Sequence, residues 1–289
     1  MLLDTAVLES KAGFAFYFRK GVKPKQMEHL APEIVLFGIK FDLAAILMIL
    51  VASIVVLILG VSAASKASVT NPGKLQNFLE WVVEFVENII GSTLGSKYGK
   101  PFMTLGLTLI MFIFVGNMLG LPLSIVTEHT EPTRIFGADL VTPELLKEAA
   151  SKAKDAHEAA VGIAWWKSPT ADVSMTAALA LTVIFLSHFL GLTRNTKHYL
   201  KHYVEPHWVM FPLNVIKEVS KPLTLALRLY GNIYAGEVMI SVIMMAGFWG
   251  IIPLFVWQGF SVFVGAIQAF VFTMLTMVYI SQNLIHEEH

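Results

Sequence analysis

The sequence predicts an all-α integral membrane protein with about five membrane-crossing helices, the last two forming a long, strongly tilted hairpin. Of its 289 residues, 55% are hydrophobic and only 15% are charged, a balance typical of chains that fold in lipid. Several stretches lack Asp, Glu, Lys and Arg altogether. Each is at least as long as the ~20 residues that a helix needs to cross ~30 Å of hydrocarbon.

Three of these stretches predict single spans, at residues 43–65, 101–127 and 173–193. Between the first two, residues 74–90 predict an amphipathic helix at the membrane interface, because their glutamates fall on one helical face and their apolar residues on the other. Residues 1–40 are expected to form an N-terminal polar segment with a short helix. Residues 41–289 are expected to form a single membrane domain.

The longest uncharged stretch follows Glu237 and predicts the hairpin. Gly247, Gly250 and Pro253 mark its turn, so its arms would cover residues 207–247 and 254–284. At 1.5 Å per residue these arms would be ~60 Å and ~46 Å long, more than the ~30 Å of hydrocarbon. Both arms should therefore tilt.

A polar loop insertion, residues 128–171, separates the second and third spans. Thr142 is a candidate N-cap and Pro143 a candidate first residue of a helix that ends near Gly162. The loop contains no pattern that indicates catalysis.

Charge and composition exclude several functions. The formal net charge is zero, so the basic surface of a nucleic-acid-binding protein is not expected. The chain has no cysteine, which excludes disulfides, thiolate metal sites and a cysteine nucleophile. The histidines have no shared metal-ligand spacing. We therefore predict no metal, no cofactor and no nucleic-acid partner.

The first arm of the hairpin carries Arg228 and Glu237. A permanent cation near the bilayer centre costs about 2.5–3.5 kcal/mol on insertion scales, so intramembrane charges indicate function. Nine helical residues correspond to about 180° of rotation and ~13.5 Å of rise. The two side chains should consequently point to opposite sides, and a structural ion pair between them is not favoured.

Arg228 is expected to stand in a stripe of small side chains. Thr224, Gly231 and Ala235 fall on the same side of the helical wheel, and small residues allow another helix to approach closely. Because the arginine pKa exceeds ~12, the guanidinium can attract a passing carboxylate without carrying protons itself.

The segment Leu-Arg228-Leu-Tyr-Gly-Asn232-Ile-Tyr-Ala-Gly-Glu237 resembles the signature of subunit a of bacterial F-type ATP synthases. Further similar pieces are Asn117-Met-Leu-Gly-Leu-Pro122, Pro169-Thr-Ala-Asp172 and the run from Gln268 to Tyr279. The resemblance extends from about residue 40 to the C-terminus.

The resemblance implies a non-catalytic, proton-conducting stator subunit of the Fo motor. Two offset half-channels would meet a ring of c subunits, and Arg228 would face the ring carboxylates and separate the half-channels. Asn232, Glu237 and Gln268 would line the proton path, with Asp172 at its outer mouth. Other implied partners are the peripheral-stalk b subunits, the rest of the F1Fo complex and the lipid bilayer.

Other polar residues are weaker candidates for the path. Ser261 and Tyr279 share a face of the last helix with Gln268, and His188 is a lone histidine on a largely apolar helix. Members of the family frequently have an ionisable residue where this chain has Ser261. Whether Glu237 works with a titratable partner or through water therefore stays open.

Three alternatives remain at this point. The ion could be Na⁺; the chain could be a secondary transporter, although no internal repeat is visible; or it could be an intramembrane hydrolase, although no nucleophile or zinc motif is present. Counting Lys and Arg does not orient the chain. The resemblance implies a bacterial inner-membrane location, with the N-terminus periplasmic and the C-terminus cytoplasmic.

Overall fold

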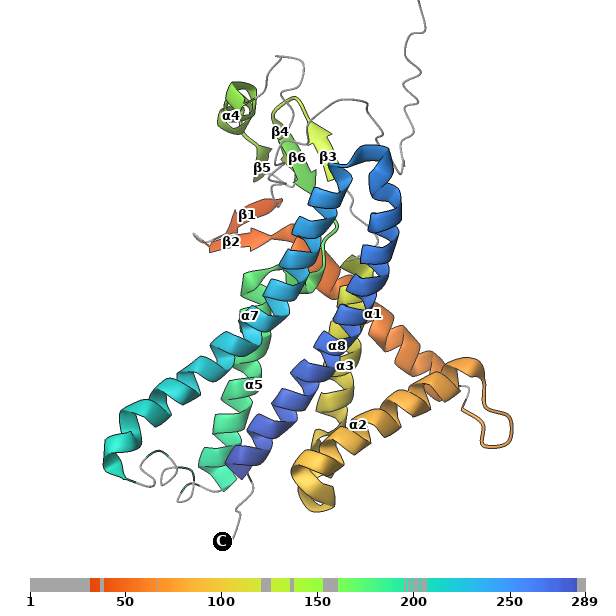
Figure 1. Ribbon diagram of the computed structural model, residues 1–289, viewed down its shortest axis with the longest axis vertical. Helices are drawn as coiled ribbons and strands as arrows, with labels where there is room; N and C mark the ends of the chain where they lie inside the picture. Colours follow the sequence, from red (N-terminus) through yellow and green to blue (C-terminus); the bar gives the residue numbers. More distant parts are fainter. Residues whose placement is uncertain are drawn as a thin grey trace, which may run out of the picture.

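The chain forms a bundle of long helices with small antiparallel strand pairs at one end (Figure 1). The computed structural model describes residues 32–284, except 37–38, 66, 121–125, 136–137, 153–160, 195, 197–198, 200–202 and 204–206. The long helices are α1 (Leu43–Ser65), α2 (Lys74–Gly99), α3 (Met103–Gly120), α5 (Val173–Arg194), α7 (Phe211–Met244) and α8 (Ile251–Leu284). The shorter helical elements are α4 (Pro143–Lys152) and the 3-10 turns η1 (Lys100–Phe102), η3 (Pro169–Ala171), η4 (Trp208–Met210) and η5 (Gly247–Gly250).

Four helical segments in the described part of the chain are long and apolar enough to cross a membrane. They are Leu43–Ser65, Lys100–Gly120, Val173–Arg194 and Gly247–Leu284. The second ends earlier than the expected span 101–127: α3 stops at Gly120, and Val126 already begins a strand. Pro122 follows in the sequence, and helical backbone is disfavoured immediately before a proline.

Helix α7 is not among these four because charged residues lie along it. It is nevertheless as long as α8, with 34 residues in each, which corresponds to ~51 Å. The arms begin at Phe211 and Ile251, whereas the sequence suggested 207 and 254. Pro253 therefore lies in the first helical turn, where its missing N–H is tolerated.

The turn between α7 and α8 depends on a glycine. Gly247 has φ 59°, a left-handed conformation that glycine adopts without a steric penalty. The two helices contact one another, and Figure 1 shows them meeting at this turn and diverging toward the opposite end. Helix α5 lies between their diverging ends in the same view and contacts both.

Helix α2 includes the amphipathic segment expected at 74–90 but continues to Gly99. Glu80, Glu84 and Glu87 are exposed, while Val86 and its apolar neighbours are buried against the bundle. Gly95 interrupts the helix with φ 68° and ψ 171°, which divides α2 into two helical pieces. The interfacial position of this helix stays a prediction.

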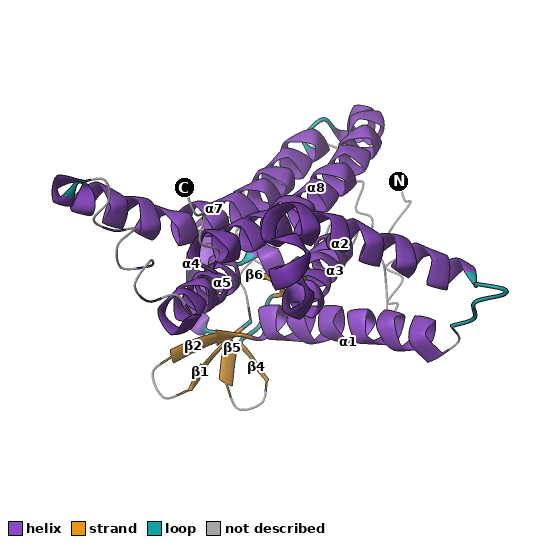
Figure 2. Cartoon of the chain, turned by 90° about the horizontal axis from the view of Figure 1, so that it is seen from below, coloured by secondary structure: helices purple, strands orange, loops and turns teal. Residues whose placement is uncertain are grey.

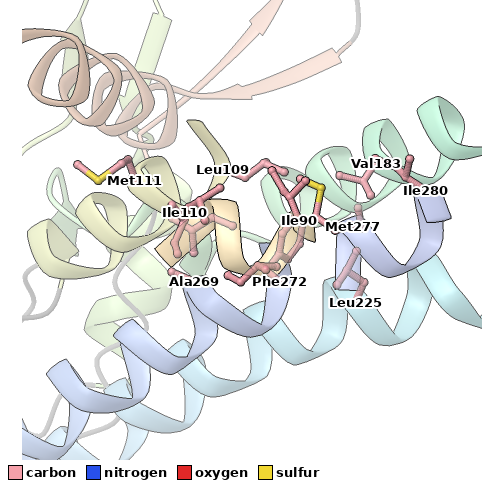
Figure 3. Packing of buried hydrophobic residues seen from close by; sticks show 14 of the residues in the cluster. Ile90, Leu109, Ile110, Met111, Val183, Leu225, Ala269, Phe272, Met277 and Ile280 are labelled. Carbon is pink, nitrogen blue, oxygen red and sulfur yellow. The ribbon is translucent and has the colours of Figure 1, made fainter. Parts of the chain in front are cut away.

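The core lies where α8 meets α2, α3, α5 and α7. Figure 3 shows Phe272 and Met277 of α8 packed among side chains of the other helices, including Ile90, Leu109 and Leu225. Phe272, Met277 and Ile280 are 0% exposed. Since lipid is as apolar as these side chains, close packing holds such helices together more than the hydrophobic effect does.

The outer faces of the helices are also apolar. On α1, Leu50, Ile54 and Leu57 are more than half exposed, and α5 exposes Leu181, Phe185 and Phe189 in the same way. An exposed apolar surface of this extent indicates contact with lipid.

In the described residues, three strand pairs that were not expected from the sequence lie at the end of the molecule that holds the α7–α8 turn (Figure 1). Strand β1 (Glu33–Leu36) pairs with β2 (Ile39–Asp42), β3 (Val126–His129) with β6 (Val161–Ala164), and β4 (Thr133–Ile135) with β5 (Ala138–Val141), all antiparallel. Figure 2 shows β1, β2, β4 and β5 gathered beside the start of α1.

These strands bear on two expectations. The described residues of the segment 1–40 form a strand pair with residues up to Asp42; the short helix expected in this segment stays a prediction, because residues 1–31 lie outside the described part. The helix of the polar loop does begin at Pro143, with Thr142 Oγ1 accepting from the Leu145 N–H at 3.3 Å. Its expected end near Gly162 is wrong, because Gly162 lies in β6, where its neighbours Val161 and Ile163 are buried.

Candidate functional site

Arg228 lies near the middle of α7 and is exposed. It makes no hydrogen bond or ion pair with any residue that the structure describes, and in particular none with Glu237. This agrees with the helical geometry expected from their spacing. A permanent cation therefore projects from the centre of a long helix without a neutralising group from the described part of its chain.

The surface around Arg228 is open. Thr224 is exposed, and its hydroxyl donates to the Ser220 carbonyl of its own helix at 2.9 Å. A Cβ built on Gly231 would meet nothing within 4 Å, and Ala235 is exposed as well. The stripe of Thr224, Arg228, Gly231 and Ala235 is thus a narrow, accessible strip of α7, which we call the small-residue face.

Asn232 and Gln268 meet between α7 and α8. The Asn232 Nδ2 amide donates to Gln268 Oε1 at 2.6 Å. Gln268 is 2% exposed, and its own Nε2 has no hydrogen-bond partner among the residues that the structure describes. Two turns earlier in α8, the buried Ser261 hydroxyl also lacks a partner within this described part. Buried donors of this kind are costly unless water or a visiting ion reaches them.

Asp172 and Glu237 lie on the side of the molecule that carries the strands. Asp172 caps the N-terminus of α5, accepting from the Ser174 and Met175 N–H groups at 2.7 and 3.1 Å. Lys167 Nζ lies 3.9 Å from Asp172 Oδ2 and forms a salt bridge with Asp42, which in turn caps α1. Glu237 lies seven residues before the end of α7, toward the same end of the molecule.

A buried polar network holds this region together. Asn117 Nδ2 donates to the Gly265 carbonyl at 3.1 Å, and Asn117 Oδ1 accepts from Thr170 Oγ1 at 2.6 Å. Both side chains are 0% exposed. The two segments that resembled the family at Asn117 and at residues 169–172 therefore contact one another and fix α3 to α8 beside the cap of α5.

A second polar cluster lies toward the opposite end of α7, and sequence reasoning missed most of it. Glu218 is 7% exposed, and Lys221 Nζ donates to its Oε1 at 2.5 Å and to Gln282 at 3.2 Å. Lys221 also lies over the Tyr279 ring, 5.4 Å from its centroid. His188 Nε2 is 3.9 Å from Glu218 Oε2.

The candidate residues thus form two groups. Asp172, Glu237, Asn232, Gln268 and Ser261 occupy the half of the molecule toward the strands; His188 and Tyr279 gather with Glu218 and Lys221 toward the other end. Arg228 lies between the groups along α7. The fold and this arrangement define a multi-pass helical membrane protein in which polar groups extend from both ends toward one exposed arginine.

The chain belongs to the ATP synthase A chain family, whose sequence profile matches residues 45–281. The curated ATP synthase subunit a of Bacillus velezensis is 43% identical over 277 residues, which cover 90% of this chain and 100% of that protein. The corresponding protein of Anoxybacillus flavithermus is 44% identical over 269 residues, with 90% and 100% covered. That of Staphylococcus carnosus is 43% identical over 271 residues, with 89% and 98% covered.

Family membership makes this chain a non-catalytic, ion-translocating stator component of the Fo part of an ATP synthase. The family predicted from the segment around Arg228 is therefore confirmed, as is the helical, multi-pass membrane fold. The secondary-transporter and intramembrane-hydrolase interpretations are set aside.

Proposed function

We propose that this chain conducts protons through two offset half-channels to a ring of c subunits, and that Arg228 separates the half-channels. One observation carries the proposal: Arg228 is exposed at mid-helix, unpaired within the described chain and surrounded by the small-residue face. A charge held in that way lacks a structural purpose inside the subunit. It is available to a carboxylate on a neighbour that moves.

The electrostatic attraction between Arg228 and a ring carboxylate would be strong enough for this role. At an effective dielectric of ~20, two unit charges ~4 Å apart attract by about 4 kcal/mol. That attraction is enough to keep a ring carboxylate deprotonated as it passes Arg228. A tighter contact would trap the ring, so we expect a loose or water-mediated approach. Arginine suits this position because it does not release its proton.

The two polar groups supply the two half-channels. In the outer one, protons would enter near Asp172 and pass Glu237, Asn232 and Gln268, with Ser261 alongside. In the inner one, they would leave past Tyr279 and the cluster that contains His188 and Glu218. Thr224, which bonds its own helix, would serve mainly to keep the small-residue face narrow.

Orientation and partners follow from the same proposal. The strand-bearing end would face the periplasm and the C-terminus the cytoplasm, in a bacterial inner membrane. Helix α7 would cross as a fifth, strongly tilted span, since ~51 Å of helix exceeds ~30 Å of hydrocarbon. Besides the c-ring, the subunit would contact the peripheral-stalk b subunits, the remaining F1Fo complex and lipid.

The decisive experiment is proton-driven ATP synthesis by the complete complex in vesicles. Arg228→Ala is expected to abolish synthesis, whereas Glu237→Gln should slow it because water can replace part of a relay. The amount of assembled subunit in the vesicles serves as the control. Undiminished synthesis by the Arg228→Ala complex at equal assembly would refute the proposal.

The ion itself needs a separate measurement. We expect synthesis to proceed at the same rate with and without added sodium when a proton gradient is imposed. A strict sodium requirement would instead identify the Na⁺-translocating form of the same subunit.

A further inference from the structure

The cluster of Glu218, Lys221 and His188, toward the lower end of α7 in Figure 1, continues into further hydrogen-bonding groups beyond the residues assigned to the inner half-channel. Glu218 has two inequivalent carboxylate oxygens. Oε1 accepts from Lys221 at 2.5 Å, while Oε2 is buried and has no hydrogen-bond partner among the described residues. Oε2 lies 3.9 Å from Nε2 of His188, on α5.

His188 connects Glu218 to two tyrosines. Its Nδ1 is 3.0 Å from the Tyr199 hydroxyl, and that hydroxyl is 2.8 Å from the hydroxyl of Tyr203. The rings of His188 and Tyr199 meet edge to face, as do those of the two tyrosines. Four groups therefore form a polar line from a buried carboxylate on α7, across α5, to the segment between the two helices, with one gap of 3.9 Å between Glu218 and His188.

A glycine in α5 leaves room for the first tyrosine of this polar line. A Cβ added to Gly191 would lie 2.7 Å from Tyr199 Cδ2, a distance that real side chains do not tolerate. Glycine at 191, one turn after His188, thus lets the Tyr199 ring lie directly against α5. Tyr199 is 9% exposed, whereas Tyr203 is only half-buried, so the line leads outward.

We propose that His188, Tyr199 and Tyr203 form a proton relay between Glu218 and the aqueous phase at this end of the molecule. The inference rests on the proposed function, which it deepens by naming the terminal part of one proton path. Lys221 acts as a positioning residue: by holding Oε1, it leaves Oε2 directed to His188. Gln282 holds Lys221, and Tyr279 covers it.

Each step of the relay gives up one proton and takes up one proton at named atoms. A proton on Glu218 Oε2 passes to His188 Nε2, which leaves a carboxylate and an imidazolium. The Nδ1 proton then moves to the Tyr199 oxygen while the Tyr199 proton moves to Tyr203, whose own proton leaves to water. The neutral imidazole must exchange its tautomer, by ring rotation or through water, before the next transfer.

The geometry sets the slow step. The 3.9 Å between Oε2 and Nε2 exceeds a direct hydrogen bond, so a ring rotation or one bridging water completes the first transfer. Tyr203 relays without ionising, because burial and the hydrogen bond to Tyr199 raise the pKa of Tyr203 above its ordinary value.

The test compares passive proton conduction by complete complexes in vesicles after removal of the soluble head. His188→Gln keeps a polar side chain of similar size but cannot carry a proton. We expect it to slow conduction at least about tenfold, since a positioned acid–base group contributes ~10²–10⁴-fold and water provides a slower bypass. Tyr203→Phe should slow it as well. Thr182→Ala, which removes an exposed α5 hydroxyl bonded only to its own helix, is the matched control.

Chemical rescue separates a relay from a packing role. Added imidazole should restore conduction to His188→Gly, whereas pyrazole, which has the same shape but stays unprotonated near neutral pH, should not. Equal rescue by both, or wild-type conduction by His188→Gln, would overturn the relay. Proton-driven ATP synthesis by Arg228→Ala distinguishes the two proposals: if synthesis is undiminished, the proposed function fails, and if synthesis is lost while His188→Gln conducts like the wild type, only the relay fails.

Discussion

Asn232 and Gln268 join α7 to α8 by one side-chain hydrogen bond of 2.6 Å, one helical turn from Arg228. Gln268 is 2% exposed. Replacing the Asn232 side chain by an apolar one would therefore leave the Gln268 side-chain oxygen buried without this donor. Such a loss costs about 1–3 kcal/mol. We therefore expect Asn232→Leu and Gln268→Leu each to lower proton-driven ATP synthesis.

The pair should behave as a unit. In a double-mutant cycle on the synthesis rate, the double variant is expected to lose less than the sum of the single variants, with a coupling energy of ~0.5–3 kcal/mol. Strictly additive losses would show that the two amides act independently.

Arg228 was predictable from the sequence because its isolation follows from helical periodicity alone. Small residues recur with it on one face of the wheel, and Glu237 falls opposite. The buried positions of Glu218 and Lys221 were not predictable in this way. Near a helix end, charges three residues apart also fit a solvated surface pair. Their burial depends on α5 and α8 folding over them, which local periodicity does not encode.

At the scale of elements, Gly120 at the end of α3 fits against Ser168. A Cβ on Gly120 would lie 2.3 Å from Ser168 Cβ and 2.4 Å from its Cα. Ser168 is buried and donates to the Gly116 carbonyl at 3.2 Å, so it cannot move aside cheaply. Gly120→Ala should therefore destabilise the subunit by about 1–3 kcal/mol, the usual cost of overpacking.

The measurement is the thermal midpoint of the purified complex, together with the amount of subunit in the membrane. Gly60→Ala is the matched control, since a Cβ there meets nothing within 4 Å and alanine favours the helix. An equal midpoint for the two variants would contradict the tight fit at Gly120.

Helices were predicted more completely than strands for a physical reason. The need to satisfy every backbone group in lipid makes a long apolar run a helix whatever surrounds it. Strand β3 instead pairs with β6 across the whole polar insertion. Its partner is remote in sequence, and segments of four residues carry too little alternation to reveal it.

At the scale of the whole molecule, the small-residue face is the surface that the ring would occupy. Leucine at Gly231 meets nothing within the chain but would widen this face beside Arg228. We expect Gly231→Leu to fold and insert normally yet to reduce proton-driven synthesis severely. Gly60→Leu, on the exposed side of α1, should leave synthesis unchanged. Comparable activity of the two would argue that the ring docks elsewhere.

Charge counting left the orientation in the membrane open, and the chain path shows only which elements share an end of the molecule. The α7–α8 turn and the strand pairs share one end of the molecule, and α8 ends at the other (Figure 1). The two polar groups therefore lie toward opposite ends, a relation that residues 188 and 237, far apart in sequence, could not disclose by themselves.

The most direct test of the account is cross-linking between this subunit and the ring, for which a chain without native cysteine provides a clean background. Cysteines would replace Thr224 or Ala235 on the small-residue face, with Leu181, exposed on α5, as the control position. A second cysteine would lie beside the mid-membrane carboxylate of the c subunit. Oxidation should give an adduct of this chain with one c subunit from both small-residue-face positions and none from the control. No adduct from either, or an equal yield from Leu181→Cys, would contradict a ring that turns past Arg228.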